Sequence, residues 1–285
     1  MKSWEEAAQR WLREKKRKKT IDEDRQKLEW LAPYLAHRPL SDIDAERIAA
    51  VAELKATEAS PSTANRYLSL IRSILRRACL RWEWVPRVPV IELYPEPKRR
   101  VRWLTRRQVV RLFQELPEHQ RPVVAFALAT GLRQANVVRI EWSQVDLPRR
   151  RAWVHGDQAK GQLPIAVPLN QVAVQVLQEA EGKHPRRVFT YRGRPFNAAN
   201  TRAWRRALAR AGIEDFRWHD LRHTWASWHV QEGTPLFVLQ ELGAWRSEAM
   251  VKRYAHLAPH QFAEHAETVS QLLLPLPDLD GPPDF

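Results

Sequence analysis

Residues 218–224 read WHDLRHT, and this stretch decides how the rest of the chain is interpreted. It sets two histidines beside an arginine, whose planar fork can contact two oxygens of one phosphate. His219 and His223 are four residues apart and face the same way on a helix. A zinc ion needs three or four protein ligands, and neither a Cys partner nor a His-Glu-x-x-His pattern accompanies the pair. We therefore expect no metal here, and we expect His223, like His256, to be a supporting or core histidine.

Three further short sequence patterns occur along the chain, at residues 130–133, 242–245 and 253–256. Residues 130–133 read TGLR, residues 242–245 read LGAW, and residues 253–256 read RYAH. Arg222 lies 23 residues before Trp245, and Trp245 lies 9 residues before Tyr254. Each pattern alone arises by chance, but four of them in this order form a specific signal.

Together these stretches resemble the tyrosine recombinase (phage integrase) family over about residues 100–265. The resemblance implies an enzyme that cleaves and rejoins DNA through a 3′-phosphotyrosine and needs no cofactor. It also implies the following catalytic residues: Arg133, Lys160, His219, Arg222, Trp245 and Tyr254.

The residue types suit that chemistry. A tyrosine nucleophile keeps the phosphate in a covalent link, which stores the energy for rejoining. Arg133 and Arg222 would stabilise the negative charge of the transition state, since no carboxylate cluster suggests bound Mg²⁺. By the resemblance, His219 contacts the phosphate or helps to take the proton of Tyr254, and Lys160 protonates the leaving 5′ oxygen.

Two positions depart from the pattern common in the family. Trp245 stands where many members have His, and its indole N–H can donate a hydrogen bond but cannot shuttle protons. Asn136 stands where many members have Glu or Asp, so any buried ion pair there is lost. We interpret Asn136 as a tolerated variation.

Composition points to a polyanion as the partner. The 285 residues predict about two domains, and 28% charged with 44% hydrophobic residues exclude a disordered chain. The net charge is +14, with balances of +7 over residues 1–100, +12 over residues 101–253 and −5 thereafter. Double-stranded DNA is the first candidate.

Cys79 is the only cysteine, which excludes an intramolecular disulfide and fits the cytoplasm. The sequence has no apolar run that predicts a membrane span.

The first 85 residues have a helical pattern. We expect helices over 4–19, 20–35, 41–56 and 60–82, the third capped by Ser41. The fourth has an apolar stripe with basic residues on its other side. We expect the following side chains there and in the linker to contact DNA: Arg66, Arg72, Arg76, Arg77, Lys98, Arg99 and Arg100.

Prolines at 86, 89, 95 and 97 predict a linker. The sequence thus predicts a mainly α protein with an N-terminal four-helix core-binding domain (1–85), a linker (86–100) and an α-rich catalytic domain (101–274). Runs at 151–155 and 163–169 predict a small antiparallel β-sheet in the second domain, and residues 275–285 predict a flexible tail.

By the resemblance, the function is that of a phage or prophage integrase, with a homotetramer on DNA (a dimer per site) and a possible accessory DNA-bending protein. Residues 261–274 are an amphipathic candidate for docking in cis or in trans. The small N-terminal DNA-binding domain of many members is expected to be absent, naturally or by truncation. Two alternatives stay open: a type IB topoisomerase-like nicking–closing enzyme, and a catalytically silent DNA-binding protein.

Overall fold

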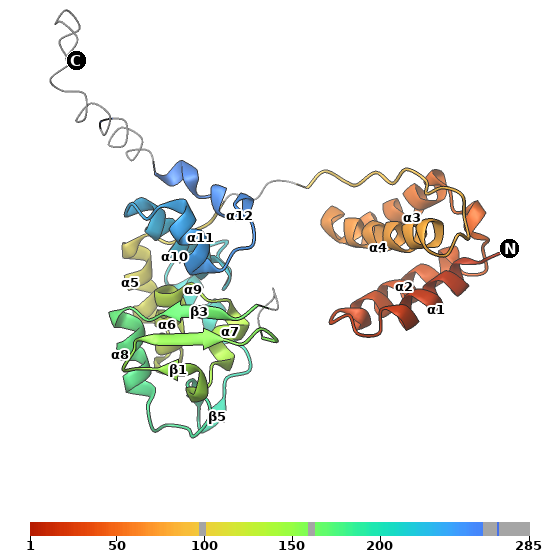
Figure 1. Ribbon diagram of the computed structural model, residues 1–285. Coiled ribbons are helices and arrows are strands. Elements are labelled where there is room, and N and C mark those ends of the chain that lie inside the picture. The colour runs from red at the N-terminus through yellow and green to blue at the C-terminus, as the bar shows by residue number, and fades with distance from the viewer. Residues whose placement is uncertain (97–100, 159–162, 259–266, 268–285) are drawn as a thin grey trace, which may run out of the picture. The chain divides into compact units, whose positions relative to one another are not determined.

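The computed structural model describes residues 1–96, 101–158, 163–258 and residue 267. The chain divides into two compact units, Met1–Arg99 and Arg100–Phe285. Hydrophobic side chains form one core in the first unit and two clusters in the second, the smaller of which contains Trp245 and Tyr254. Helices predominate in both units, and short antiparallel strands occur in the second (Figure 1). The predicted fold class is confirmed.

The first unit contains the four predicted helices. They are α1 (Trp4–Glu14), α2 (Ile21–Leu35), α3 (Ala45–Glu58) and α4 (Pro61–Leu80). Helix α1 packs on α2 and α4, and α3 packs on α4. The apolar stripe of α4 is buried as predicted, and its members are Leu68, Ile71, Ile74, Leu75 and Ala78. Burial of this stripe removes apolar surface from water and is what holds α4 in the bundle.

Two predicted helix ends were wrong. The first helix ends at Glu14, and the basic residues that follow form a turn. The third helix is capped by Asp44, whose side chain accepts a hydrogen bond from the backbone N–H of Arg47 at 2.9 Å. Ser41 lies instead in the short 3₁₀ turn Leu40–Asp42, because burial of Leu40 and Ile43 on either side holds the chain in that turn.

The second unit is mostly helical. Its helices are α5 (Arg106–Glu115), α6 (Arg121–Thr130), α7 (Gln134–Arg139), α8 (Gln171–Ala180), α9 (Arg202–Arg210), α10 (Asp220–Gln231), α11 (Leu236–Gly243) and α12 (Ala249–Lys252). Its short strands lie between α7 and α9 in the chain. Short 3₁₀ turns complete them at Glu118–Gln120, Trp142–Gln144 and Ala255–Leu257. Helix α6 lies at the centre of the packing, because it contacts both α8 and α10.

The strands form two small antiparallel sheets. They are β1 (Val145–Asp146), β2 (Arg151–Val154), β3 (Ile165–Pro168), β4 (Thr190–Tyr191) and β5 (Arg194–Pro195). The predicted pair is β2 and β3, with Ala152 opposite Val167. The sequence missed β1, β4 and β5, because two residues are too few to show a period of two. The three-stranded sheet lies below α10 and α11 in Figure 1, and β3 contacts α11.

Helix α10 carries the residues around which the site is built. The Oγ1 of Thr224 is buried, donates to the carbonyl of Asp220 at 2.8 Å, and accepts from the backbone N–H of Leu104 at 3.1 Å. These bonds fix the first turn of α10 against the segment that leads into α5. Among the described residues, no helix has the length and apolarity needed to cross a bilayer.

Candidate active site

A single guanidinium joins three of the four sequence patterns. Arg222, on α10, is buried, with 5% of its surface exposed. Its Nη1 donates to the carbonyl of Gly131 at 2.8 Å, and its Nη2 donates to the carbonyl of Gly243. Its guanidinium also lies over the ring of Trp245, 4.4 Å from the centroid. The TGLR, HDLRH and LGAW stretches therefore meet at one side chain.

The absence of a side chain at Gly131 and at Gly243 allows indole rings to pack directly on the two backbone segments that hold Arg222. Gly131 ends α6 in the left-handed conformation, with φ of +62°, and a Cβ there would lie 2.3 Å from the ring of Trp225. A Cβ on Gly243 would lie 2.3 Å from the ring of Trp245. Side chains at these positions would displace the two indoles and, with them, the carbonyls that hold Arg222.

The site concentrates positive charge. Arg133 is half-buried at the N-terminus of α7, and desolvation lowers its pKa. Burial, followed by the charge of Arg133, lowers the pKa of Arg222 to about 10, so Arg222 stays protonated at neutral pH. Within the described part of the chain, neither arginine forms an ion pair with a carboxylate. Two uncompensated guanidinium groups near each other favour binding of an anion.

Tyr254 follows α12 and is almost fully buried, with 1% of its surface exposed. Its hydroxyl lies 2.5 Å from Nδ1 of His223. Its ring lies 5.9 Å from that of Trp245. Burial raises the pKa of Tyr254 to about 12, against the opposing charges of Arg253 and Arg222. The phenol therefore carries its proton at neutral pH in this state.

His219 lies at the exposed start of α10, with its ring edge-on to that of His223 at 5.1 Å. Desolvation, followed by the charge of Arg222, lowers its pKa. The sequence analysis left two roles open for His219, contact with the phosphate or help in taking the proton of Tyr254. In the structure, the residue that contacts the Tyr254 hydroxyl is His223. No grouping of three or more His, Cys, Asp or Glu side chains suited to a metal occurs among the described residues.

A hollow beside Arg133 completes the described part of the site. Arg133 and Trp245 line it together with Met250 and the residues leading into β3, from Leu163 onward. Lys160 itself lies outside the described residues, as do Lys98, Arg99, Arg100 and nearly all of the predicted docking segment 261–274. Asn136 is buried on α7, and its Nδ2 has no hydrogen-bond partner among the described atoms.

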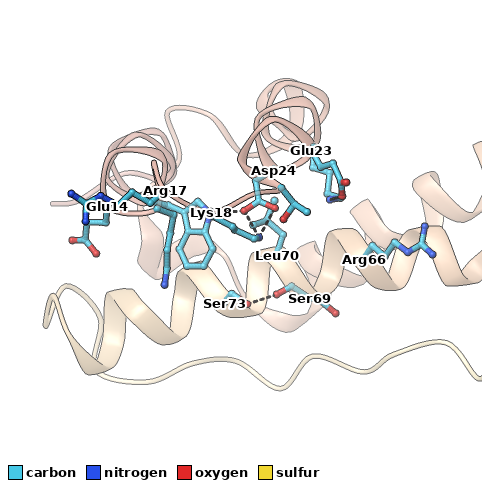
Figure 2. A pocket seen from close by; sticks show the side chains of 13 residues that line it. Glu14, Arg17, Lys18, Glu23, Asp24, Arg66, Ser69, Leu70 and Ser73 are labelled. Carbon is cyan, nitrogen blue, oxygen red and sulfur yellow. Dashed lines mark hydrogen bonds and ion pairs between the residues drawn. The ribbon is translucent and has the colours of Figure 1, made fainter. Parts of the chain in front are cut away.

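The first unit has a separate basic hollow, between the turn after α1, the start of α2, and α4 (Figure 2). Five basic residues line it, Lys15, Arg17, Lys18, Lys27 and Arg66, against three acidic ones, Glu14, Glu23 and Asp24. Lys18 is tied to the buried carboxylate of Asp24 at 2.7 Å, and the same carboxylate accepts from the indole of Trp11 at 3.0 Å. The hydroxyls of Ser69 and Ser73 also line this hollow.

The four predicted arginines of α4 differ in their surroundings. Arg66 and Arg76 are exposed. Arg72 donates to the carbonyl of Ile91, and Arg77 forms an ion pair with Glu14 at 2.6 Å. Only the first two therefore keep their guanidinium groups directed at solvent.

Comparison with known proteins shows which family has this arrangement of residues. The family described as "Phage integrase family" matches residues 102–261, and "Phage integrase central domain" matches residues 4–83. This chain belongs to the phage integrase family. The integrase of Salmonella phage P22 is 38% identical over 95% of this chain and 80% of its own length. A shufflon-specific DNA recombinase of Escherichia coli is 30% identical over 77% of this chain, which spans 58% of that relative. The resemblance to tyrosine recombinases is confirmed.

Solved structures share the fold of this phage integrase family member. A lambda integrase (75–356) dimer bound to a COC′ core site aligns with a TM-score of 0.73 at 21% identity, covering 87% of this chain and 97% of that one. A lambda integrase tetramer bound to a Holliday junction aligns with a TM-score of 0.74 at 20% identity, covering 89% and 77%. At these identities the alignments establish the fold.

Proposed function

We propose that this chain is a site-specific DNA recombinase that cleaves and rejoins DNA through a 3′-phosphotyrosine on Tyr254. The observation that carries the proposal is the site around Arg222. Tyr254 lies near the charge of Arg222, and Arg222 lies near that of Arg133. Neither Arg222 nor Arg133 has a carboxylate partner in the described chain, and Arg222 is anchored through two backbone carbonyls. Such a site favours a phosphate, whose negative charge grows in the transition state.

The anchoring of Arg222 sets its orientation before DNA arrives. A guanidinium has five N–H donors. Two of them hold the carbonyls of Gly131 and Gly243, and the other three have no hydrogen-bond partner among the described residues. Because the group needs little reorganisation, its charge acts at full strength in the transition state. Arg133 contributes the second charge from the N-terminus of α7.

The reaction follows from this geometry. The Tyr254 oxygen attacks phosphorus, and the bond from phosphorus to the 5′ oxygen breaks. The leaving oxygen takes a proton, for which Lys160 is the proposed donor. The reverse attack by a 5′ hydroxyl of another strand exchanges strands and restores the tyrosine, so the bond energy is conserved.

The proposed assembly follows the relatives. The solved lambda integrase structures include a dimer bound to a COC′ core site and a tetramer bound to a Holliday junction. We propose the same two assemblies on double-stranded DNA for this chain. In the first unit, the basic hollow of α4 and the exposed Arg66 and Arg76 would contact phosphates, which orients the protein on the duplex.

The test is a trapped covalent adduct. A duplex that the protein selects from a random-sequence library is nicked near the cleaved bond, so that the short fragment carrying the released 5′ hydroxyl diffuses away. We expect an SDS-stable adduct that forms in EDTA, disappears in Tyr254→Phe, and persists in Tyr191→Phe, where the exposed tyrosine of β4 serves as the matched control.

Two results would contradict the proposal. Tight binding by the wild-type protein without any adduct would indicate a silent DNA-binding protein. An adduct without four-way junctions, when two intact duplexes with the same site are supplied, would indicate a nicking–closing enzyme.

A further inference from the structure

The contact between His223 and Tyr254 identifies a residue beyond those implied by the family pattern. His223 lies on α10, next to Arg222, whereas Tyr254 lies 31 positions further along the chain. Their side chains nonetheless meet at 2.5 Å, between Nδ1 and the phenol oxygen. His223 is therefore hydrogen-bonded to the hydroxyl of Tyr254.

The direction of the hydrogen bond follows from the burial of Tyr254. A buried hydroxyl needs an acceptor for its proton, and 1% of this tyrosine is exposed. Among the described residues, Nδ1 of His223 is the atom within hydrogen-bond distance of that hydroxyl. Nδ1 therefore accepts the phenol proton, and in the neutral imidazole the hydrogen is on Nε2.

The electrostatic surroundings keep His223 neutral. The charged and titratable groups around it are His219 and Arg222 on its own helix, and Arg253 with Tyr254 after α12. Burial, followed by these positive neighbours, lowers the pKa of His223 to about 4. The free protein thus holds an unprotonated imidazole against a protonated phenol. A phosphate entering beside Arg222 would bring negative charge, which favours the imidazolium.

We propose that His223 is the proton acceptor for Tyr254 during cleavage. As the phenol oxygen bonds to phosphorus and the bond to the 5′ oxygen breaks, the phenol proton moves to Nδ1 of His223. The leaving 5′ oxygen takes its proton from a separate donor, for which Lys160 is proposed above. During rejoining, His223 returns the proton to Tyr254. This inference rests on the proposed function.

The test separates the two proton transfers. The cleaved bond is first mapped with the wild-type adduct, and a second duplex then carries sulfur in place of the bridging 5′ oxygen. A thiolate leaves without protonation, so the sulfur duplex rescues the loss of a leaving-group acid but not the loss of a base for the nucleophile. Single-turnover adduct formation is measured on both duplexes, with gel-shift binding and thermal melts on every protein.

We expect His223→Ala to lower the rate on the order of 10²-fold on both duplexes at neutral pH, with DNA binding unchanged. Its rate should rise steadily with pH, since hydroxide must then remove the phenol proton. His223→Asn keeps an acceptor oxygen near the position of Nδ1 but takes up no proton, and it should be as slow as His223→Ala. His229→Ala is the matched control, because His229 is also half-buried on α10 and its Nδ1 bonds to Thr234 at 3.0 Å.

Three results would overturn the assignment. Wild-type rates in a folded His223→Ala would show that no proton passes to this residue. Rescue of that variant by the sulfur duplex would place His223 at the leaving group. Full activity in His223→Asn would reduce its role to a hydrogen bond. Absence of an adduct in the wild type is a different result, and it would count against the proposed function itself.

Discussion

The two units use arginine in opposite ways. In the second unit, Arg222 is buried and held by two backbone carbonyls and an indole ring. In the first unit, Arg66 is exposed at the edge of a basic hollow (Figure 2). Charge interactions are strong and dependent on orientation in a buried site, but at a surface they are screened within about 10 Å at ordinary ionic strength. The difference predicts that catalysis depends on the geometry of single residues, whereas surface binding is a sum of small contributions.

The largest expected effect is at Arg222. Arg222→Ala leaves the carbonyls of Gly131 and Gly243 buried without their donors, and we expect it to lower the free energy of unfolding on the order of 3 kcal/mol. It should also abolish adduct formation. Arg222→Lys keeps the charge but supplies a point donor in place of the planar fork. We expect it to recover part of the stability and little of the activity, as measured by denaturant melts and single-turnover cleavage.

That pair of variants tests the comparison directly. If Arg222→Lys cleaved DNA at the wild-type rate, a positive charge at this position would be sufficient for catalysis. The orientation of the guanidinium would then matter no more in the buried site than it does at the surface. Arg107→Lys, at an exposed position of α5 in the same unit, is the matched control. We expect that substitution to change neither stability nor cleavage.

The next largest effect is at Gly131. Gly131→Ala forces a Cβ to within 2.3 Å of Trp225 and also places alanine at φ of +62°. Gly212 has a similar φ of +64°, but nothing lies within 4 Å of its Cβ position. Gly212→Ala should therefore cost only the backbone strain of about 1–2 kcal/mol, and Gly131→Ala a further 1–3 kcal/mol or so. Denaturant melts of both variants measure the difference, and equal losses would mean that Trp225 moves aside freely.

These residues also show which features of the fold and of the site can be predicted from the sequence. The motif order predicted the family, and helical periodicity predicted α1 to α4 with the buried stripe of α4. Local rules misplaced the cap of α3, because Asp44 and Ser41 are both good caps and tertiary burial of Leu40 decided between them. The role of Gly131 and Gly243 as acceptors for Arg222 depends on contacts between distant segments. The same is true of His223, whose partner lies 31 positions away.

The smallest expected effect is on the surface of the first unit. Arg66 and Arg77 are both on α4. Arg66→Ala removes one exposed charge, whereas Arg77→Ala removes the ion-pair partner of Glu14 on α1. If Arg66 contacts a phosphate, its loss lowers the salt slope of DNA binding by about 1. Arg77→Ala should leave that slope nearly unchanged and lower thermal stability instead, because Glu14 also accepts from Arg10 and Trp82 and would lose one of its donors.

The measurement is DNA affinity by fluorescence anisotropy across a range of salt concentrations, with melts of both variants. Because each released counterion contributes separately to the slope, a phosphate contact changes the dependence on salt as well as the affinity at one salt concentration. A slope reduced in Arg77→Ala but not in Arg66→Ala would reverse the assignment and place DNA on the side of α4 that faces α1. Equal slopes in both variants and the wild type would place the duplex away from this face of α4. The two arginines differ in whether a carboxylate already holds them, so the pair isolates the contribution of a charge that is free to meet phosphate.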